Sequence, residues 1–255
     1  MQVVKIVDDE MFKYGNRKRA LICFTRIPQP KTTKTRLEDI LTPQECAELQ
    51  WAMLRDVAEA CHECGADVYV AYSVNDKVQF EEEKCHKEVN NGLIRLREIF
   101  AYAEGFFLQK GGDLGEKMKN AISTVIDLKY DNCILIGSDI PEITGEYIDM
   151  AFEILEKTEN DIVITPTSDH GYCLIGMKKV WGSIFDGKVY GSGEVCEDAC
   201  DAAREEGKKV AVLPKMRDVD TCEDIVMLNR YEESGCEHTI AFLRLIEDNS
   251  DCILK

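Results

Sequence analysis

Short runs of apolar residues alternate along this chain with longer segments in which apolar positions recur every three or four residues. Continuous runs bounded by polar residues or glycine are typical of buried strands. Six of them stand out, and they cover Ala20–Phe24, Asp67–Ser73, Cys133–Gly137, Asp161–Pro166, Tyr172–Met177 and Lys209–Leu213. A further short strand is expected over Gln2–Val7, inside a polar lead-in formed by residues 1–18.

The segments between these runs have the period of amphipathic helices. This pattern predicts helices over Pro43–Cys64, Leu93–Tyr102, Leu114–Leu128, Gly145–Lys157, Glu194–Glu206 and Thr239–Ile246. One more helix is expected to begin at Thr221, because Glu223 and Asp224 supply an acidic first turn.

Strands that alternate with helices predict a largely parallel sheet with helices on both faces. The runs Asp161–Pro166 and Tyr172–Met177 are too close for a helical crossover, so they are expected to add an antiparallel element. We predict one α/β domain over residues 19–232, with the lead-in 1–18 before it and a helical extension at 233–255 packed on it. Ligands of such sheets bind at the carboxyl ends of the strands.

The composition and net charge of the chain limit the classes of binding partner that are expected. The 255 residues are 45% hydrophobic and carry a net charge of −17, which repels nucleic-acid backbones and anionic membranes. No apolar run approaches the length of a membrane span, and the charged N-terminus lacks the apolar core of a signal peptide. We therefore expect a cytoplasmic protein whose partners are small molecules. The sequence leaves both a monomer and a homodimer as alternatives.

The 12 cysteines do not indicate a secreted disulfide framework, because several lie in predicted strands, where a reduced thiol behaves as a small apolar residue. The stretch Cys61-His62-Glu63-Cys64 has the spacing of a metal or redox pair. No second pair follows it, and it closes a long helical pattern, so a packing role is favoured.

A cation-rich loop follows the first strand. Within Pro28–Leu37, the side chains of Lys31, Lys34 and Arg36 concentrate positive charge, and threonines supply hydroxyl donors. A strand that breaks into such a loop before a helix is a common way to hold phosphate. The alternative is a solvated basic turn.

Carboxylates follow two other strands. Asp139 comes directly after a buried strand, and Asp218 and Asp220 follow the last one, so the three can meet at one sheet edge around a divalent cation. Such clustered negative charge is costly without a cation. The alternatives are helix caps, with Asp139 capping a helix near Thr144 and Asp220 capping the next helix along the chain.

Two loops add further candidates. A glycine-rich turn holds Gln109 and Gly112, and its glycines allow close approach of a ligand. Gln109 can donate and accept hydrogen bonds to a base edge. The second loop, Asp169–Tyr172, lies between two strands and can face an acceptor, although a hairpin turn explains it nearly as well. No Gly-x-Ser-x-Gly elbow, Walker-type phosphate loop or dinucleotide fingerprint occurs.

These motifs, taken in order, resemble an incompletely characterised family of glycosyltransferase-A-like proteins related to 2-phospholactate guanylyltransferases and other nucleotide-diphospho-sugar transferases. The resemblance runs from about Ala20 to Leu228. It is carried by Lys34-Thr35-Arg36-Leu37, Gln109 with Gly112-Asp113-Leu114-Gly115, Gly137-Ser138-Asp139-Ile140-Pro141, Asp169 with Gly171-Tyr172, and Asp218-Val219-Asp220-Thr221.

The resemblance implies a Rossmann-like three-layer αβα fold with a nucleotide at the carboxyl edge of a mostly parallel, mixed sheet. It implies that Mg²⁺ (or Mn²⁺) binds Asp139 and Asp220, with Asp218 nearby, and that Lys34, Arg36 and Asp169 take part in catalysis. The nucleotide-binding candidates are Lys31, Lys34, Thr35, Arg36, Gln109 and Gly112. The acceptor-side candidates are Asp169, Gly171 and Tyr172.

The chain departs from the family pattern at three places. Lys31 replaces a usual glycine, His170 replaces a glycine before Gly171, and Tyr190-Gly191-Ser192 replaces a Trp-Ser-Thr element. Glycosyl transfer from a nucleotide sugar to a small acceptor is the leading hypothesis. The alternatives are nucleotidyl transfer to a phosphorylated small molecule with release of pyrophosphate, and nucleotide binding without catalysis.

Overall fold

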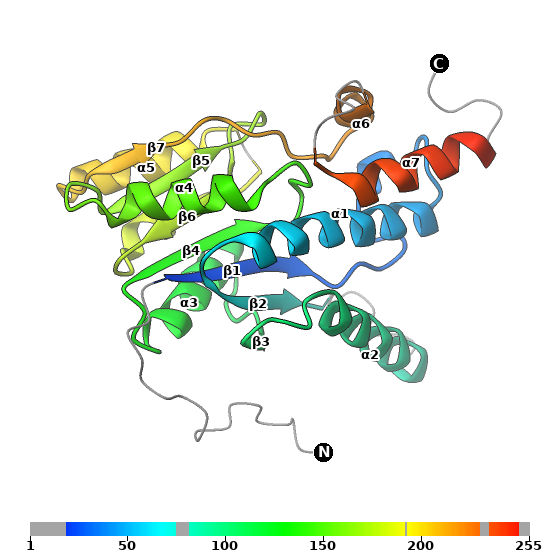
Figure 1. Cartoon of the computed structure of the whole chain (residues 1–255), viewed down its shortest axis with the longest axis horizontal. Coiled ribbons are helices and arrows are strands. Elements are labelled where there is room, and N and C mark those ends of the chain that lie inside the picture. The colour runs from blue at the N-terminus through cyan, green and yellow to red at the C-terminus, as the bar shows by residue number, and fades with distance from the viewer. Residues whose placement is uncertain (1–18, 75–81, 192, 230–234, 250–255) are drawn as a thin grey trace.

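The computed structural model describes residues 19–74, 82–191, 193–229 and 235–249. The strand expected over residues 2–7 and the lead-in therefore lie outside the described residues. Seven strands form one sheet in the order β3-β2-β1-β4-β6-β5-β7 (Figure 1). They are β1 (Arg19–Arg26), β2 (Asp67–Ser73), β3 (Gly105–Leu108), β4 (Asn132–Gly137), β5 (Ile162–Pro166), β6 (Tyr172–Met177) and β7 (Val210–Val212).

The sheet is mostly parallel, as predicted. Strand β1 pairs in parallel with β2 and β4, so that Ile22 lies between Tyr69 and Leu135. Strand β2 pairs in parallel with β3, and β5 with β7. Only β6 runs against its neighbours β4 and β5 among the described strands. The antiparallel element expected from the short β5–β6 connection is thus confirmed.

Helices cover both faces of the sheet. They are α1 (Pro43–Glu63), α2 (Glu82–Ile99), α3 (Leu114–Ile126), α4 (Gly145–Glu156), α5 (Val195–Glu205), α6 (Cys222–Asn229) and α7 (Glu237–Asn249). Helices α1, α2 and α4 lie on one face, α3 and α5 lie on the other, and α6 and α7 lie beside α1 (Figure 1). The three-layer αβα prediction is confirmed. None of the helices in the described ranges is both long and apolar enough to cross a membrane.

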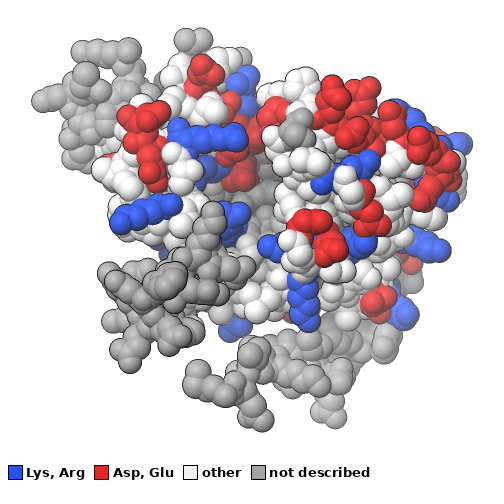
Figure 2. Space-filling view, turned by 180° about the vertical axis from the view of Figure 1, so that it is seen from behind, with Lys and Arg blue, Asp and Glu red and all other residues white. Residues whose placement is uncertain are grey.

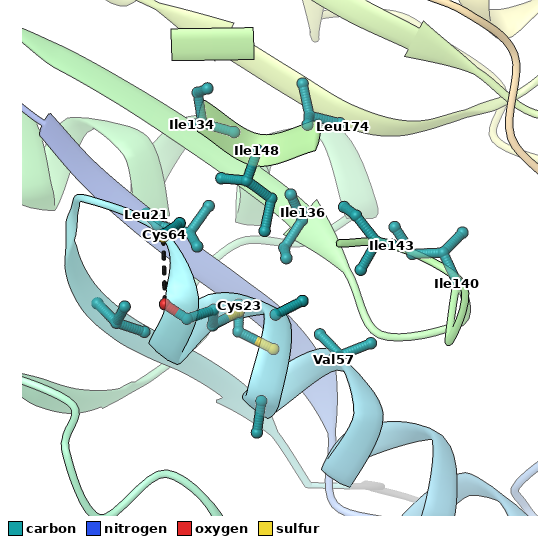
Figure 3. Packing of buried hydrophobic residues seen from close by; sticks show 14 of the residues in the cluster. Leu21, Cys23, Val57, Cys64, Ile134, Ile136, Ile140, Ile143, Ile148 and Leu174 are labelled. Carbon is teal, nitrogen blue, oxygen red and sulfur yellow. Dashed lines mark hydrogen bonds between the residues drawn. The ribbon is translucent and has the colours of Figure 1, made fainter. Parts of the chain in front are cut away.

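Burial on both faces explains why the central strands read as continuous apolar runs rather than alternating ones. On the first face, Leu21 and Ile136 pack against Val57 of α1 and Ile148 of α4 (Figure 3). On the second face, Ile22 and its neighbours in the sheet pack against α3 and α5. Burying this apolar surface fixes the sheet and leaves its carboxyl edge to form a site.

Ten cysteines have side chains that the structure describes; all ten are free thiols, and nine of them are buried. Cys61 and Cys64 belong to the apolar core of the first face, and the Cys64 thiol donates to the Cys61 carbonyl oxygen at 3.1 Å. Burial raises the pKa of Cys64 to about 11, so the thiol stays protonated and inert near neutral pH. The geometry matches the packing role favoured above.

Helix α7 is fixed to α1 by one buried carboxylate. Asp56 is 3% exposed, and its oxygens accept from the backbone N–H groups of His238 and Thr239 and from the Thr239 hydroxyl. A helix N-terminus otherwise leaves such donors without partners. Asp56 therefore does for α7 what an N-cap residue does for its own helix.

We expect Asp56→Ala to lower the free energy of unfolding by about 2 kcal/mol, because buried hydrogen bonds to a charged group are lost and two helix N–H groups are left without their acceptor. Urea denaturation of the two proteins measures this difference. Asp56→Asn keeps one acceptor oxygen and is expected to lose less. Equal midpoints for the wild type and Asp56→Ala would contradict this role.

Candidate functional site

The order of the strands reverses next to β1. The chain first adds β2 and β3 on one side of β1 and then places β4 on the other side. Ligands of open α/β sheets bind outside the carboxyl ends of the strands at such a reversal. A cavity of about 770 Å³ opens there, and Thr25 at the end of β1 and Ser138 after β4 both line it.

Residues from distant parts of the sequence meet around this cavity. The predicted site residues that line it are Lys34, Thr35, Arg36, Gln109, Gly112, Asp139 and Asp220. Lys31, Asp169, Gly171, Tyr172 and Asp218 are not among the lining residues. The cation-rich loop, the glycine-rich turn and two of the three carboxylates are therefore gathered in one place, whereas the acceptor-side candidates lie outside it.

The cavity is basic for a strongly acidic protein. Arg26, Lys34, Arg36 and Lys117 contribute four cations to its lining, against three carboxylates. Elsewhere the charge is mixed: seen from behind, the surface carries groups of acidic side chains with Lys and Arg between them (Figure 2). An anionic ligand is therefore favoured inside the cavity although the net charge of the chain is −17.

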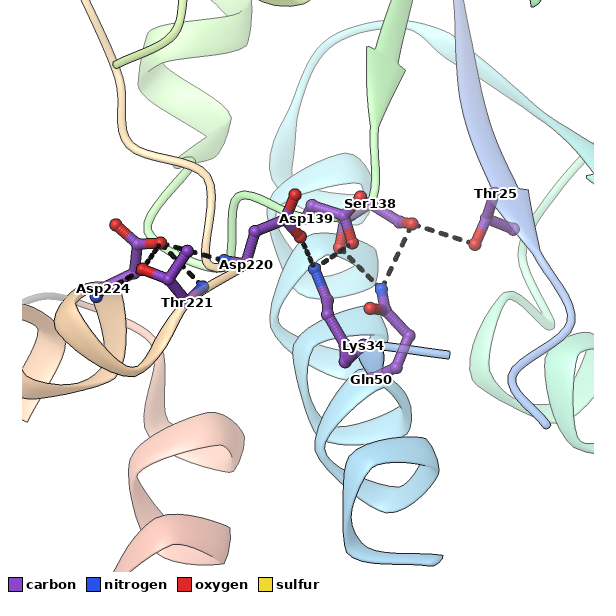
Figure 4. A network of polar contacts seen from close by, with 8 residues as sticks. All are labelled: Thr25, Lys34, Gln50, Ser138, Asp139, Asp220, Thr221 and Asp224. Carbon is purple, nitrogen blue, oxygen red and sulfur yellow. Dashed lines mark hydrogen bonds and ion pairs between the residues drawn. The ribbon is translucent and has the colours of Figure 1, made fainter. Parts of the chain in front are cut away.

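Lys34 connects the two carboxylates. Its Nζ atom lies 2.7 Å from Asp139 Oδ1 and 2.7 Å from Asp220 Oδ1 (Figure 4). The lysine side chain is 4% exposed, whereas the aspartate side chains are 49% and 38% exposed. Burial by itself lowers the pKa of Lys34, but the attraction and hydrogen bonds of Asp139 and Asp220 outweigh it and raise the pKa above its ordinary value.

The backbone places Lys34 in this position. Lys34 adopts a left-handed conformation, with φ 51°, directly before the short 3-10 helix η1 (Thr35–Leu37). Upstream of it, the Gln29 backbone N–H donates to the hydroxyl oxygen of buried Thr33 at 2.9 Å, and downstream the Leu37 side chain is fully buried. The loop is thus anchored on both sides of the lysine.

The structure excludes the helix-cap alternative for Asp139 and Asp220. Thr144, not Asp139, is the N-cap of α4, and its hydroxyl oxygen accepts from the Tyr147 backbone N–H. At α6, the Asp224 carboxylate accepts from the Thr221 N–H and hydroxyl. Neither Asp139 nor Asp220 is needed as a cap, so both carboxylates are available to the cavity.

A buried polar network supports the floor of the cavity. The Thr25 hydroxyl donates to Ser138 Oγ at 3.0 Å and joins the ends of β1 and β4. Gln50, in the middle of α1, donates through Nε2 to the Ser138 carbonyl oxygen at 3.1 Å. These contacts hold the segment that carries Asp139, which is the next residue in the chain (Figure 4).

Gln109 has a more restricted chemistry than expected from the sequence. Its Nε2 group donates to the carbonyl oxygens of Thr25 at 2.7 Å and Ala71 at 3.0 Å, so both amide hydrogens are used inside the protein. Any ligand in the cavity then meets Oε1, which only accepts. Our expectation that Gln109 both donates to and accepts from a base edge is therefore wrong in its first half.

The loop between β5 and β6 has the contacts of a hairpin turn. Asp169 Oδ1 accepts from the Thr167 hydroxyl at 2.5 Å and from the Gly171 backbone N–H at 3.0 Å. His170 takes the left-handed conformation there, with φ 69°. The hydroxyl of Tyr172 lies 3.3 Å from that of Tyr190. The turn explanation accounts for these residues, and their role on the acceptor side stays a prediction.

Asp218 does not join the pair formed by Asp139 and Asp220. Burial raises the pKa of Asp218 to about 6, and the charge of Asp169 adds to the effect, followed by those of Asp220 and Asp224. Asp218 does not line the cavity, and its part in holding a metal stays a prediction.

This shift has a consequence for stability. A carboxyl group whose pKa is raised on folding favours its protonated form, so stability is highest below the unfolded pKa of about 4 and falls as the pH rises towards 6. We expect the melting temperature of Asp218→Asn, relative to the wild type, to rise between pH 4 and 6 and to level off above. Calorimetry in the presence of a chelator measures the two melting temperatures. A difference between them that stays constant from pH 4 to 6 would count against a raised pKa of Asp218.

Three lining residues belong to no motif that the sequence singles out. Arg26 ends a strand, Lys117 lies in the first turns of α3, and Gln50 lies in α1. Ser138 lies inside the motif of residues 137–141, but the sequence gives no sign of its supporting role. In the sequence, nothing distinguishes Gln50 from a solvent-exposed polar residue of a helix, but in the structure it is only 4% exposed. Lys31, by contrast, is exposed.

The pair of carboxylates fits a divalent cation by its chemistry. Mg²⁺ prefers oxygen ligands and usually binds one or two protein carboxylates together with substrate phosphates. Because Asp139 Oδ1 and Asp220 Oδ1 contact the same nitrogen atom, they already hold a single cation between them. In the described ranges, the one group of three ligating side chains within reach of a single ion is Asp56, Glu59 and His238. None of the three lines the cavity, and Asp56 caps α7.

The comparisons with known proteins agree with this fold. Residues 56–192, more than half of the chain, match the family described as uncharacterized proteins conserved in bacteria (DUF2064). The chain belongs to this family. The matched segment includes Gln109 and Asp139 but neither Lys34 nor Asp220. No curated protein matches the chain.

Solved structures extend the match to most of the chain. A candidate nucleotide-diphospho-sugar transferase from Desulfovibrio desulfuricans G20 is 29% identical, with a TM-score of 0.77 over 91% of this chain and 96% of that one. A cytidylyltransferase from Leptospira borgpetersenii is 15% identical, with a TM-score of 0.48 over 94% and 98%. The 4-diphosphocytidyl-2C-methyl-D-erythritol synthase from Anaerococcus prevotii is 14% identical, with a TM-score of 0.49 over 85% and 99%. The resemblance to nucleotide-diphospho-sugar transferases inferred from the motifs is confirmed.

Proposed function

We propose that the protein is a Mg²⁺-dependent transferase that uses a nucleotide-activated donor, with glycosyl transfer from a nucleotide sugar to a small acceptor as the favoured reaction. One observation carries the proposal: Lys34, Asp139 and Asp220 meet at 2.7 Å beside a basic cavity at the strand reversal. The 29% identical neighbour, a candidate nucleotide-diphospho-sugar transferase, supports the same class.

The residues have distinct tasks in this proposal. Lys34 and Arg36 contact the phosphates and stabilise negative charge on the leaving diphosphate. Asp139 and Asp220 hold Mg²⁺ or Mn²⁺, which when bound supplies further charge neutralisation on the same phosphates. Gln109 accepts a hydrogen bond through Oε1, so it favours a base that presents an N–H group.

In this proposal the acceptor binds beside the hairpin between β5 and β6. The hairpin with Asp169 and Gly171, and Tyr172 packed against Tyr190, lie next to the carboxyl edge of the sheet but do not line the cavity. A small acceptor that enters between this hairpin and the bound donor would complete the site. Asp169 then orients the acceptor or takes its proton.

Nucleotidyl transfer is the second candidate, and the four cations of the cavity favour it because they suit a triphosphate. In that reaction a phosphorylated small molecule attacks the α-phosphate of a nucleoside triphosphate and pyrophosphate leaves. Release of pyrophosphate indicates nucleotidyl transfer, and release of a nucleoside diphosphate indicates glycosyl transfer.

A thermal-shift screen tests the proposal first. Nucleoside di- and triphosphates and nucleotide sugars are added with and without Mg²⁺, and a ligand at 100 times its dissociation constant stabilises the folded protein by about 2.7 kcal/mol. We expect stabilisation by at least one nucleotide that requires the metal. Binding without turnover of any donor would leave a nucleotide-binding module, and no stabilisation by any nucleotide would overturn the proposal.

A further inference from the structure

The position between Asp139 and Asp220 already contains a cation that belongs to the chain. The Lys34 ammonium contacts one oxygen of each carboxylate at 2.7 Å, and its side chain is the least exposed of the three. The two carboxylates come from different elements, one after β4 and the other before α6. Without a cation between them, their mutual repulsion would be unfavourable in this partly buried place.

A divalent cation and the ammonium compete for the same oxygen atoms. Both need Asp139 Oδ1 and Asp220 Oδ1, and two cations in contact with the same pair of oxygen atoms lie close enough to repel each other, even though the two carboxylates are partly exposed. With Lys34 alone the three groups carry a net charge of −1, and with a divalent ion in its place the carboxylates are neutralised. Only one occupant fits at a time.

The side chain of Lys34 can rotate away from the two carboxylates into the cavity. The loop backbone is anchored at Thr33 and Leu37, but the four-carbon side chain rotates about its own bonds. Lys34 lines the cavity together with Arg26, Arg36 and Lys117, so a displaced ammonium enters a space that already holds three other cations and that favours an anion. That move is favourable only if phosphate is present there.

We propose that Lys34 and a divalent cation are alternative occupants of the position between Asp139 and Asp220, so that metal binding releases Lys34 to the phosphates of the nucleotide. The second half of this inference rests on the proposed function. It follows that the metal alone binds weakly, and that metal and nucleotide each strengthen the binding of the other. Lys34 thus occupies the metal position until a phosphate ligand is present to bind its ammonium group.

The decisive experiment measures Mn²⁺ binding without any nucleotide, by electron paramagnetic resonance of the free ion, at neutral pH. Lys34→Met removes the competing charge and keeps the length of the side chain. We expect this variant to bind Mn²⁺ about tenfold or more tightly than the wild type, because the positive charge that competes for the two carboxylates is gone. Adding Asp139→Asn to Lys34→Met is expected to abolish the gain.

Lys129→Met is the matched control, because Lys129 is also a left-handed lysine but is exposed and lies three residues after the end of α3. It is expected to bind Mn²⁺ as the wild type does. Circular dichroism confirms that each variant is folded. Equal or weaker Mn²⁺ binding by folded Lys34→Met, or no Mn²⁺ binding by either protein, would overturn the inference.

The outcome separates this inference from the proposed function. If the wild type binds a nucleotide with Mg²⁺ but Lys34→Met shows no gain for Mn²⁺, the competition is refuted and the proposed function stands. If Lys34→Met gains Mn²⁺ affinity but no nucleotide binds either protein, the competition stands and the proposed function fails.

Discussion

Asp139→Ala is expected to abolish the metal-dependent part of nucleotide binding while the protein stays folded. Asp139 supplies one of the two oxygens that contact Lys34, and Asp220 alone leaves a single carboxylate for the metal. The loss of one such contact in a transition state costs about 3 kcal/mol, roughly a hundredfold in rate. Titration calorimetry with and without Mg²⁺ measures the binding effect.

Glu223→Ala is the control for this change. Glu223 is an exposed carboxylate in the first turn of α6, close to Asp220 in the sequence but outside the cavity. It is expected to bind nucleotide and Mg²⁺ like the wild type. If Asp139→Ala kept its full Mg²⁺-dependent affinity, Asp139 would have no part in holding the metal.

Lys34→Met is expected to lower turnover of the donor by about a hundredfold or more, because the cation that meets the leaving phosphates is lost. This loss accompanies the gain in Mn²⁺ affinity argued above, so metal affinity and turnover change in opposite directions. Steady-state kinetics at saturating metal measure it. The methionine variant keeps the backbone strain of a left-handed non-glycine residue, which removes that strain as an explanation.

The Lys129→Met control again carries the same type of substitution at a left-handed lysine outside the cavity. Its turnover is expected to equal that of the wild type. A folded Lys34→Met protein with wild-type turnover would show that Lys34 does not act on the transferred or leaving group, whatever its effect on metal binding.

The sheet was predictable from the sequence because its strands are buried on both faces and therefore read as apolar runs. Strand β3 (Gly105–Leu108) was missed, since it offers only three apolar residues after a glycine and lies at the edge of the sheet. Helix α2 was expected to begin at Leu93 but begins at Glu82. The sequence of its first half is mostly polar and charged, so it lacks the periodic signal.

The site was predictable only in part. Each motif marked a residue at a strand end, and the fold brings Lys34, Asp139 and Asp220 together. The sequence could not show that Asp218, two residues before Asp220, does not line the cavity. It also could not show that Gln50 reaches from α1 to Ser138, because that contact depends on how a helix packs on the sheet.

The arrangement of cation, carboxylates and nucleotide is tested most directly by a crystal structure of the protein with Mn²⁺ and the best nucleotide from the thermal-shift screen. We predict an anomalous manganese peak between Asp139 and Asp220, with Lys34 turned to the phosphates and Arg36 beside them. A nucleotide bound elsewhere, or a manganese peak away from these two carboxylates, would contradict it.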